Sequence, residues 1–526
     1  MPTEGYWNAP FMYPQEAIMT FSDNLLGTFI LYSFYRFLGC DVYLAFQLWM
    51  VSITILNYCC AYLFINYLLK NKFAAALGAF IFAFSVALVS QYSHPQVYAR
   101  FCVPLAFMFA VKFQETLKTR HFFWMVFFVV YQFYCVVYLG FMLAFPLAIF
   151  FAIAIITSWS KFISKVSLKY LAKLGIFLII NILMLLPLVI PYMNSPAKFR
   201  PNGEIVYRKF EEVINTIPTI QSYLFINRET IFWEPLNNVG KHLDLWWNHQ
   251  LFPGATVITA IFFLIFYGCK RVFKRNQFSK TLWAIGFSGI ITFLFYLRFD
   301  DNSLYSLLFE IPGFNAVRAL NRIINVELIF LALFVAISFR VVSRMVKYKW
   351  PLFVVILTFM VADNFLYGSG LGRFKKDRAK ERVDLVREKM KGLTPQTLVS
   401  YEPIISSDRK AWLQIDAMII AQELGLKTLN GYTGNVPTGY YQYAVFSSIG
   451  REVWKKKKDL KEDIVVISGI NDPEIERISL KIRSSAPWLE RIRKQAIERN
   501  ISVDENIIKN ASWIINQNQQ KKTINK

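Results

Sequence analysis

The feature that most constrains this chain is a succession of long apolar segments whose connecting loops alternate between strongly basic and nearly uncharged. About 20 consecutive apolar residues in an α-helix cross a bilayer core, so such segments predict membrane spans. Lys and Arg in short loops stay in the cytoplasm, and the basic loops therefore predict the inner side. These loops lie at 70–72, 112–120, 161–173, 270–280 and 340–349.

The number of spans follows from the same alternation. The stretch 121–157 is too long for one helix, and a division near Tyr138–Gly140 keeps the next basic loop inside. Pro104 lies within the short third segment and predicts a broken helix there. We therefore expect an all-α polytopic membrane protein with about ten transmembrane helices. The spans are expected at 42–69, 73–91, 100–113, 121–137, 139–157, 172–192, 252–268, 281–297, 323–339 and 351–367.

Composition agrees with this class and argues against a nucleic-acid partner. Hydrophobic residues make up 55% of the chain, and 50 of its 526 residues are Phe. The net charge of +23 would on its own also suit a nucleic-acid-binding protein. Much of that charge lies in the inner loops and in a basic tail, however, and no nucleic-acid module lies among the spans. No CxxC motif or His/Cys cluster indicates a structural zinc site.

The remaining segments are expected outside and define the domain organisation. Residues 1–41 form an outer segment, and 42–367 form the transmembrane domain with a long outer loop at 193–251. Residues 368–470 are expected to be a soluble α/β segment, with strands at 398–401 and 463–467 and a helix at 415–426 that Gly425 ends. Residues 471–526 are expected to form a helical pair, at 488–497 and 503–516.

The C-terminal part is expected to be a small α+β extracytoplasmic domain, although one segment conflicts with that orientation. The stretch 373–391 is rich in Lys and Arg and directly follows the last span. Long domains translocate largely regardless of their charge, so the five consistent inner loops decide the orientation. The protein is therefore expected to be a multi-pass protein of the cytoplasmic (inner) membrane.

The first residues raise a separate question. They lack the basic and apolar regions of a signal peptide, yet the topology places them outside. The sequence from Gly5 to Pro14 is typical of the middle of an extracellular loop. We therefore expect the natural gene to begin earlier, with one more span and the start of this loop.

Three residues of the first two outer loops are candidates for chemistry. Asp23 is either the N-cap of a helix or a carboxylate that acts as general base or metal ligand. His94 is either a hydrogen-bonded structural residue or a ligand of a metal or a phosphate. Arg100 either extends its charge to the membrane surface or binds an anionic headgroup.

Two arginines before the ninth span are candidates for binding an anion. Arg318 and Arg322 lie four residues apart, so they would share one face if the segment is helical. Their side of the membrane contradicts the positive-inside tendency, and ionisable groups at membrane depth are functional candidates. Arginine keeps its charge and binds phosphate with two donors at once. Glu327 would be their counter-ion.

Two further loops admit two interpretations each. The aromatic residues within Trp246–Gly254 would either stack on a sugar or belong to the belt of aromatic side chains at the membrane interface. The loop Leu429–Tyr440 is rich in Gly and Asn but lacks the GxxxxGK[ST] pattern of a nucleotide-binding loop, and a turn-rich connection is the alternative.

The order of several motifs resembles that of a known family. The motifs are Asn8–Pro14, Phe21–Asp23, His94–Gln96, Leu251–Gly254, Pro312–Phe314 followed by Arg318 and Arg322, and Asn430–Gly434. Together they resemble bacterial polytopic membrane glycosyltransferases of the GT-C type. The resemblance covers residues 1 to about 450, and residues after 470 add nothing to it. Each motif alone is weak, and their order on one side of the membrane is more specific.

The resemblance implies a function in cell-envelope glycan synthesis. Such enzymes move a sugar from a polyprenyl-phosphate carrier to a glycan, lipid or protein acceptor outside the cytoplasmic membrane. It implies Asp23 as the catalytic base, although in related proteins the key Asp follows the first span, which is expected to be missing here. It implies that Arg318, Arg322, Arg100 and His94 bind the donor phosphate. It leaves open a divalent metal ion, which His94 and Asp23 would hold.

Two other interpretations remain at this point. One is a non-catalytic membrane protein of the same fold that transports or assembles lipid-linked glycans. A transporter of that kind is expected to show paired broken helices in two related halves, and the sequence shows no such symmetry. The other is an inactive fragment of the enzyme.

Overall fold

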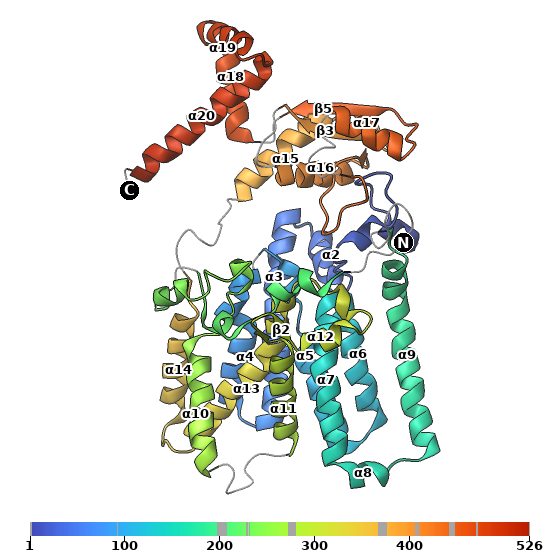
Figure 1. Cartoon of the computed structure of the whole chain (residues 1–526), viewed down its shortest axis with the longest axis vertical. Helices are drawn as coiled ribbons and strands as arrows, with labels where there is room; N and C mark the ends of the chain where they lie inside the picture. The colour runs from blue at the N-terminus through green and yellow to red at the C-terminus, as the bar shows by residue number, and fades with distance from the viewer. Residues whose placement is uncertain are drawn as a thin grey trace. The chain divides into compact units, whose positions relative to one another are not determined.

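The structure is a computed structural model that describes residues 3–91, 93–196, 208–227, 230, 232–271, 280–366, 376–404, 410–440, 448–469 and 472–524. These residues are mostly helical, with few strands. The chain divides into two compact units (Figure 1). The larger unit comprises Asp23–Ile190 and Tyr207–Gly372, and the smaller comprises Met1–Ser22, Pro191–Val206 and Arg373–Lys526.

The larger unit contains the apolar helices. Among the described residues, six helical segments are long and apolar enough to cross a bilayer, and two shorter apolar helices accompany them. The prediction of a mostly helical membrane protein is therefore confirmed. The long segments are Val42–Leu69, Lys72–Gln91, Pro95–Thr116, Val137–Thr157, Leu168–Met193 and Leu320–Val342, and the shorter helices are Ala255–Phe266 and Lys280–Phe295.

A helix lies at each of the ten positions where a span is expected. The helices in question are α3 (Val42–Leu69), α4 (Lys72–Phe84), α5 (Cys102–Thr116), α6 (Thr119–Cys135), α7 (Val137–Thr157), α9 (Leu168–Met193), α10 (Ala255–Arg271), α11 (Lys280–Phe295), α13 (Ile324–Val342) and α14 (Lys349–Asp363). Whether ten of them span the bilayer stays a prediction. Shorter helices lie elsewhere in the first 310 residues, namely α1 (Thr3–Trp7), α2 (Phe29–Phe37), α8 (Trp159–Ile163) and α12 (Tyr305–Phe309).

The stretch 121–157 is divided in the structure, as expected, but the break in the third segment lies elsewhere. Val136 adopts an extended conformation (φ −155°, ψ 112°) between α6 and α7. Pro104 lies in the first turn of α5, where a helix does not need the missing N–H group. The break precedes it, between the short helix η3 (Pro95–Tyr98) and α5. The prediction of a helix broken at Pro104 is therefore wrong.

Helix α2 was not expected within the first outer segment. None of its nine residues is buried, and its apolar side chains include Phe37, which is 87% exposed. In a membrane-embedded protein such a helix is suited to contact with lipid.

The ends of the helices in the larger unit separate two groups of loops. The basic connections between α3 and α4, α5 and α6, α7 and α9, and α13 and α14 lie at one end of the helices (Figure 1). The turn at 93–101, the start of α7 and the segment before α13 lie at the other end. The basic residues Lys274, Arg275, Arg373 and Lys375 lie outside the described residues.

The smaller unit is built on a parallel sheet. Its strand order is β4 (Lys427–Thr428), β3 (Leu398–Pro403) and β5 (Ile464–Gly469), with Leu398 opposite Lys427 on one side and Ile464 on the other. Helices α15 (Lys376–Met390), α16 (Lys410–Glu423) and α17 (Ser448–Lys457) accompany the strands. Two strands lie where the sequence predicts them, but all pairs are parallel, so this part is α/β rather than α+β.

The C-terminal segment forms three helices instead of the expected pair. They are α18 (Pro473–Ser484), α19 (Ala486–Glu498) and α20 (Val503–Ile524). Asp472 caps α18 by accepting hydrogen bonds from the backbone N–H groups of Glu474 and Ile475, and Pro473 occupies the first helical position. This start signal was missed in the sequence.

The first residues of the chain add to the sheet of the smaller unit. The backbone N–H of Met12 donates to the carbonyl of Asn430 at 3.0 Å, and that of Thr428 donates to the carbonyl of Pro10 at 2.8 Å. Phe11, Met12 and Phe21 are buried in a core that includes Trp454. The expected outer segment 1–41 is therefore divided, because the chain passes from the smaller to the larger unit between Ser22 and Asp23.

Candidate functional site

Side chains from four segments of the larger unit meet around Asp23. The Nε2 group of Gln96 donates to the Asp23 carboxylate at 3.4 Å. The Tyr138 hydroxyl is buried beside the same carboxylate without a hydrogen bond of ordinary geometry. The guanidinium of Arg322 lies over the Tyr138 ring, 4.6 Å from its centre. The turn before α2, the turn at 93–101, the first turn of α7 and the segment before α13 thus contribute to one site.

Asp23 lies in a turn and does not cap a helix. The side chain of Asn24 accepts a hydrogen bond from the backbone N–H of Leu26 at 2.8 Å, and α2 begins only at Phe29. Thr28 precedes α2, and its side chain makes no capping hydrogen bond. The interpretation of Asp23 as an N-cap is therefore wrong, and its half-buried carboxylate faces Gln96 and Tyr138 instead.

The surroundings of Asp23 make it a stronger base than an ordinary aspartate. Burial raises its pKa above the usual 3.8, because a buried carboxylate loses its hydration. The positive charge of Arg322, the Gln96 amide and the nearby Tyr138 hydroxyl lower the pKa and so oppose that effect. The carboxyl group therefore has a raised proton affinity and several neighbours that adjust it.

His94 is a neutral member of the same site. Burial, together with the positive charges of Arg322 and Arg318, lowers its pKa to about 4. At neutral pH the imidazole is therefore uncharged, so it offers one hydrogen-bond donor and one acceptor. The sequence predicts that His94 binds a phosphate or a metal, and in the structure the charges of both arginines act on it.

Arg318 and Arg322 lie near one another without sharing a regular helical turn. Val317 is extended, and the short helix η11 (Leu320–Ile323) begins only after Arg318. Arg318 is exposed and Arg322 is half-buried. The segment from Arg318 to Arg322 is not one helix, so the condition under which they would share a helical face is not met, although both charges act on His94.

Arg208 is a further cation near this site that the sequence analysis did not single out. Its Nη1 group donates to the carbonyl of Ala316 at 3.2 Å. Burial and the positive charge of Arg318 both lower its pKa, while Glu212 raises it. A signal was present, because Arg208 is a basic residue in the segment 193–251, which is expected outside, as are Arg318 and Arg322.

Arg100 interacts with a helix end rather than with the other candidates. It is fully buried, and its Nη2 group donates to the carbonyl of Phe82 at 2.6 Å, at the C-terminal end of α4. Its guanidinium also lies over the rings of Phe82 and Tyr98, at 5.1 and 5.8 Å. Cations stabilise the carbonyl end of a helix, so these contacts indicate a structural role.

Glu327 is held by a tyrosine rather than by the two arginines. The hydroxyl of Tyr223 donates to its Oε2 atom at 2.7 Å. Its Oε1 atom is buried and has no hydrogen-bond partner, and within the described part of the chain no ion pair joins Glu327 to Arg318 or Arg322. The expectation that Glu327 is their counter-ion is therefore not met.

The side chains around Asp23 and His94 do not fit a divalent metal ion. Among the described residues, no three His, Cys, Asp or Glu side chains gather closely enough to hold one. Asp23 and His94 would offer two ligands, and the charge of Arg322 acts on both of them. A nearby guanidinium repels a metal cation, so this environment favours an anion.

The motif Leu251–Gly254 has a structural explanation. The Asp363 carboxylate accepts hydrogen bonds from the backbone N–H groups of Ala255 and Thr256, at 3.0 and 2.9 Å, and from the Trp233 indole at 2.9 Å. Gly254 has φ +99°, and a Cβ atom there would lie 2.7 Å from the same carboxylate. The motif thus places the start of α10 on a buried acceptor.

Two other glycine motifs are also explained by packing. Gly313 has φ +97° and packs against the ring of Phe141, which leaves no room for a side chain. The side chain of Asn430 accepts from the backbone N–H of Tyr401 at 2.8 Å and donates to its carbonyl at 3.0 Å, which joins the loop after β4 to β3. The turn-rich interpretation of 429–440 is thus the better one.

The aromatic loop at 246–254 combines buried and exposed side chains. Trp246 packs edge-to-face against Phe225 and Trp247, with ring centres 6.4 and 5.9 Å apart. Trp247 is 52% exposed. His249 is fully buried and bonded to the hydroxyl of Ser222 at 2.7 Å, so it is structural.

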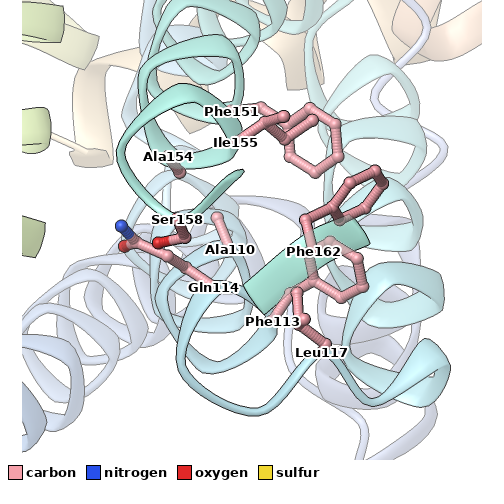
Figure 2. A pocket seen from close by; sticks show the side chains of 9 residues that line it. All are labelled: Ala110, Phe113, Gln114, Leu117, Phe151, Ala154, Ile155, Ser158 and Phe162. Atoms are coloured by element: carbon pink, nitrogen blue, oxygen red, sulfur yellow. The ribbon is translucent and has the colours of Figure 1, made fainter. Parts of the chain in front are cut away.

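A separate cavity lies far from Asp23 along the helices. It has a volume of only about 10 Å³ and lies between the C-terminal ends of α5 and α7 and α8 (Figure 2). Phe113, Phe151 and Phe162 line it. Ala154, also in its lining, is 16 residues beyond Tyr138 on α7, which corresponds to roughly 24 Å along the helix. The cavity is therefore not part of the site around Asp23.

Comparison with known proteins adds no relative to this picture. No family model, no curated protein and no solved structure matches the chain.

Proposed function

We propose that this protein is a membrane glycosyltransferase of the GT-C type. It moves a sugar from a polyprenyl-phosphate carrier to a glycan, lipid or protein acceptor. The observation that carries the proposal is the position of Asp23, a carboxyl group of raised proton affinity, beside Arg322, with the exposed Arg318 four residues earlier in the chain. A lipid-linked sugar phosphate needs both kinds of group, and it needs them at the membrane.

The chemistry assigns a separate task to each part of the site. The acceptor hydroxyl oxygen forms a bond to the anomeric carbon of the sugar while the bond from that carbon to the phosphate oxygen breaks. The bonding electron pair stays on the phosphate, and the acceptor proton passes to Asp23 as general base. Arg322 and Arg318 stabilise the charge that develops on the departing phosphate. His94, uncharged at neutral pH, hydrogen-bonds without adding charge.

The proposal includes an orientation and a location. The basic loops at one end of the helices favour the cytoplasm, so the end that carries Asp23, His94 and Arg322 lies outside. The protein then belongs to the inner membrane of a bacterium, with the C-terminal unit extracytoplasmic, and acts in cell-envelope glycan synthesis. A reporter fused after residue 400 that is active only in the cytoplasm would contradict this orientation.

The test is sugar transfer by the purified protein in lipid nanodiscs. A short-chain polyprenyl-phosphate sugar serves as donor, and release of the polyprenyl phosphate is measured with a mixture of envelope acceptors. Asp23→Asn is expected to abolish transfer and to retain donor binding, while Arg322→Gln is expected to weaken both. The matched control is Asp301→Asn, which changes an exposed carboxylate outside this cluster.

The outcomes separate this function from its alternatives. Donor binding without turnover in the unchanged protein, with equal binding by Asp23→Asn, would indicate a non-catalytic carrier of lipid-linked glycans. Equal donor binding by the unchanged protein, Arg318→Gln and Arg322→Gln would remove the basis of the proposal.

A further inference from the structure

Two segments of the larger unit that are distant in sequence are joined beside the candidate site. The hydroxyl of Thr216 donates to the carbonyl of Arg318 at 3.0 Å and accepts from the backbone N–H of Leu320 at 3.1 Å. The guanidinium of Arg208 donates to the carbonyl of Ala316. These three hydrogen bonds hold the turn at 208–216 against the segment that carries Arg318.

Among the described residues, Arg208 has one acidic partner, and the contact is weak. Its Nε atom lies 3.8 Å from Glu212, whose side chain is 57% exposed, whereas the Arg208 side chain is 25% exposed. An exposed ion pair at that distance contributes little. The Glu212 carboxylate is also shared with the backbone N–H of Lys209 at 3.4 Å. Arg208 therefore keeps most of its capacity to bind an anion.

The charges of the site follow an order that begins at the carboxyl group. Arg322 acts on Asp23 and on His94. Arg318 acts on His94 and, in the other direction, on Arg208. Arg318 is thus the charge that acts both on the candidate site, at His94, and on Arg208.

The site has one guanidinium group more than the two that the proposed function assigns to the donor phosphate. Arg318 and Arg322 suffice to engage the oxygens of one phosphate, since each guanidinium offers two parallel donors. The Arg208 and Arg318 cations repel each other, and the hydrogen bonds to Ala316 and Thr216 hold them near one another nevertheless. A second negative group between them would compensate this repulsion.

We propose that Arg208 holds a second phosphate group, next to the phosphate that Arg318 and Arg322 hold. The inference rests on the proposed function, because it takes the phosphate at Arg318 and Arg322 as given. The second phosphate belongs either to a diphosphate-linked donor or to a separate phosphate-bearing molecule, such as a phosphorylated acceptor. Both sources present the same chemistry to Arg208.

The experiment compares geranyl diphosphate with geranyl monophosphate on the full-length protein in nanodiscs, by calorimetry. Arg208→Gln is expected to weaken the affinity for geranyl diphosphate by about 10-fold or more, because a hydrogen bond between charged groups is lost. The affinity for the geranyl monophosphate that binds at Arg318 and Arg322 is expected to stay unchanged. Glu212→Gln is expected to strengthen diphosphate binding, since it removes the competing carboxylate. Arg36→Gln is the matched control, because Arg36 also donates from Nη1 to a backbone carbonyl, that of Cys40.

Each result has a definite meaning. A selective loss of diphosphate affinity supports one ligand with two phosphates. A fall from two bound monophosphates to one supports two separate molecules. Equal effects on both probes, or none, overturn the proposal, and Arg208→Lys with a thermal-unfolding scan distinguishes misfolding from lost contacts. If Arg318→Gln and Arg322→Gln leave the monophosphate affinity unchanged, the proposed function itself fails.

Discussion

The guanidinium of Arg322 lies 4.6 Å from the ring centre of Tyr138, and this contact connects the cationic part of the site to the carboxyl group of Asp23. The charge of Arg322 lowers the pKa of Asp23 and thereby opposes burial, which raises it. A phosphate that binds Arg322 compensates that charge. The basicity of Asp23 is therefore expected to depend on whether the donor is bound.

This relationship predicts two different pH profiles. The acidic limb of kcat/KM reports the pKa of Asp23 in the free protein, and that of kcat reports it in the donor complex. Because the bound phosphate compensates Arg322, the limb of kcat is expected at higher pH than the limb of kcat/KM. Initial rates between pH 4 and 8 at low and at saturating donor measure both limbs. Coincident limbs would show that the phosphate does not act on Asp23 through Arg322.

Tyr138→Phe is expected to move the acidic limb to higher pH. The Tyr138 hydroxyl lowers the pKa of Asp23, so its removal leaves the raising effect of burial less opposed. The maximal rate on the alkaline side should change less than the rate on the acidic side. Tyr134→Phe, which removes a hydroxyl that donates to the carbonyl of Met184, is the control and should leave the profile in place.

His94 predicts a loss of stability in acid. Its pKa is about 4 in the folded protein and near its ordinary value of 6.5 when unfolded, so unfolding takes up a proton between these values. The stability contributed by the neutral imidazole is complete above about pH 6.5 and falls as the pH decreases to 4. The difference between pKa values of 6.5 and about 4 sets an upper bound of about 3.5 kcal/mol on the loss, at about 1.4 kcal/mol per unit, and solvent screening of the partly exposed ring reduces it.

The thermal midpoint in nanodiscs at a series of pH values measures this dependence. His94→Gln is expected to flatten the curve between pH 6.5 and 4. His242→Gln, which changes an exposed histidine between α9 and α10, is the control and is expected to leave the curve in place. An unchanged slope in His94→Gln would exclude His94 as the titrating group.

The charge pattern of the loops, which assigns each loop to one side of the membrane, was enough to predict much of the site. Asp23, His94, Arg318 and Arg322 were assigned to one face by the charges of distant loops, and the structure brings them together. The positive-inside rule does not predict the direction in which a side chain points. Arg100 belongs to the same boundary, yet its guanidinium points into the helices and meets the end of α4.

Long-range contacts explain the remaining differences. The sequence predicts Tyr138 only as part of the division between two spans. Nothing in the sequence indicates that the start of α7 lies beside Asp23. Arg208 approaches Arg318 only through bonds between segments about 100 residues apart. The sheet of the smaller unit includes residues 10–13, and no local pattern indicates that they pair with Thr428 and Asn430.

Arg100→Gln is expected to leave phosphate affinity within about twofold of the unchanged protein. Its Nη2 group donates to the carbonyls of Phe82 and Ala83, and the guanidinium lies over the rings of Phe82 and Tyr98, so these contacts hold it at the end of α4. Arg322→Gln should weaken the same ligand by roughly 10-fold or more, because a charge-assisted hydrogen bond is lost. Titration of both variants with geranyl monophosphate compares them directly. If Arg100→Gln lost as much affinity for geranyl monophosphate as Arg322→Gln, Arg100 would have to be part of the binding site.

Asp363→Ala is expected to lower stability without affecting the site. The carboxylate is fully buried and accepts from the Trp233 indole, the N–H groups of Ala255 and Thr256, and the Thr256 hydroxyl. Its removal leaves these donors unpaired in the protein interior, which costs on the order of 1–3 kcal/mol for each unsatisfied group. A lower thermal midpoint with unchanged affinity for geranyl monophosphate is the expected result. A loss of affinity in a folded Asp363→Ala protein would instead connect the start of α10 to the phosphate site.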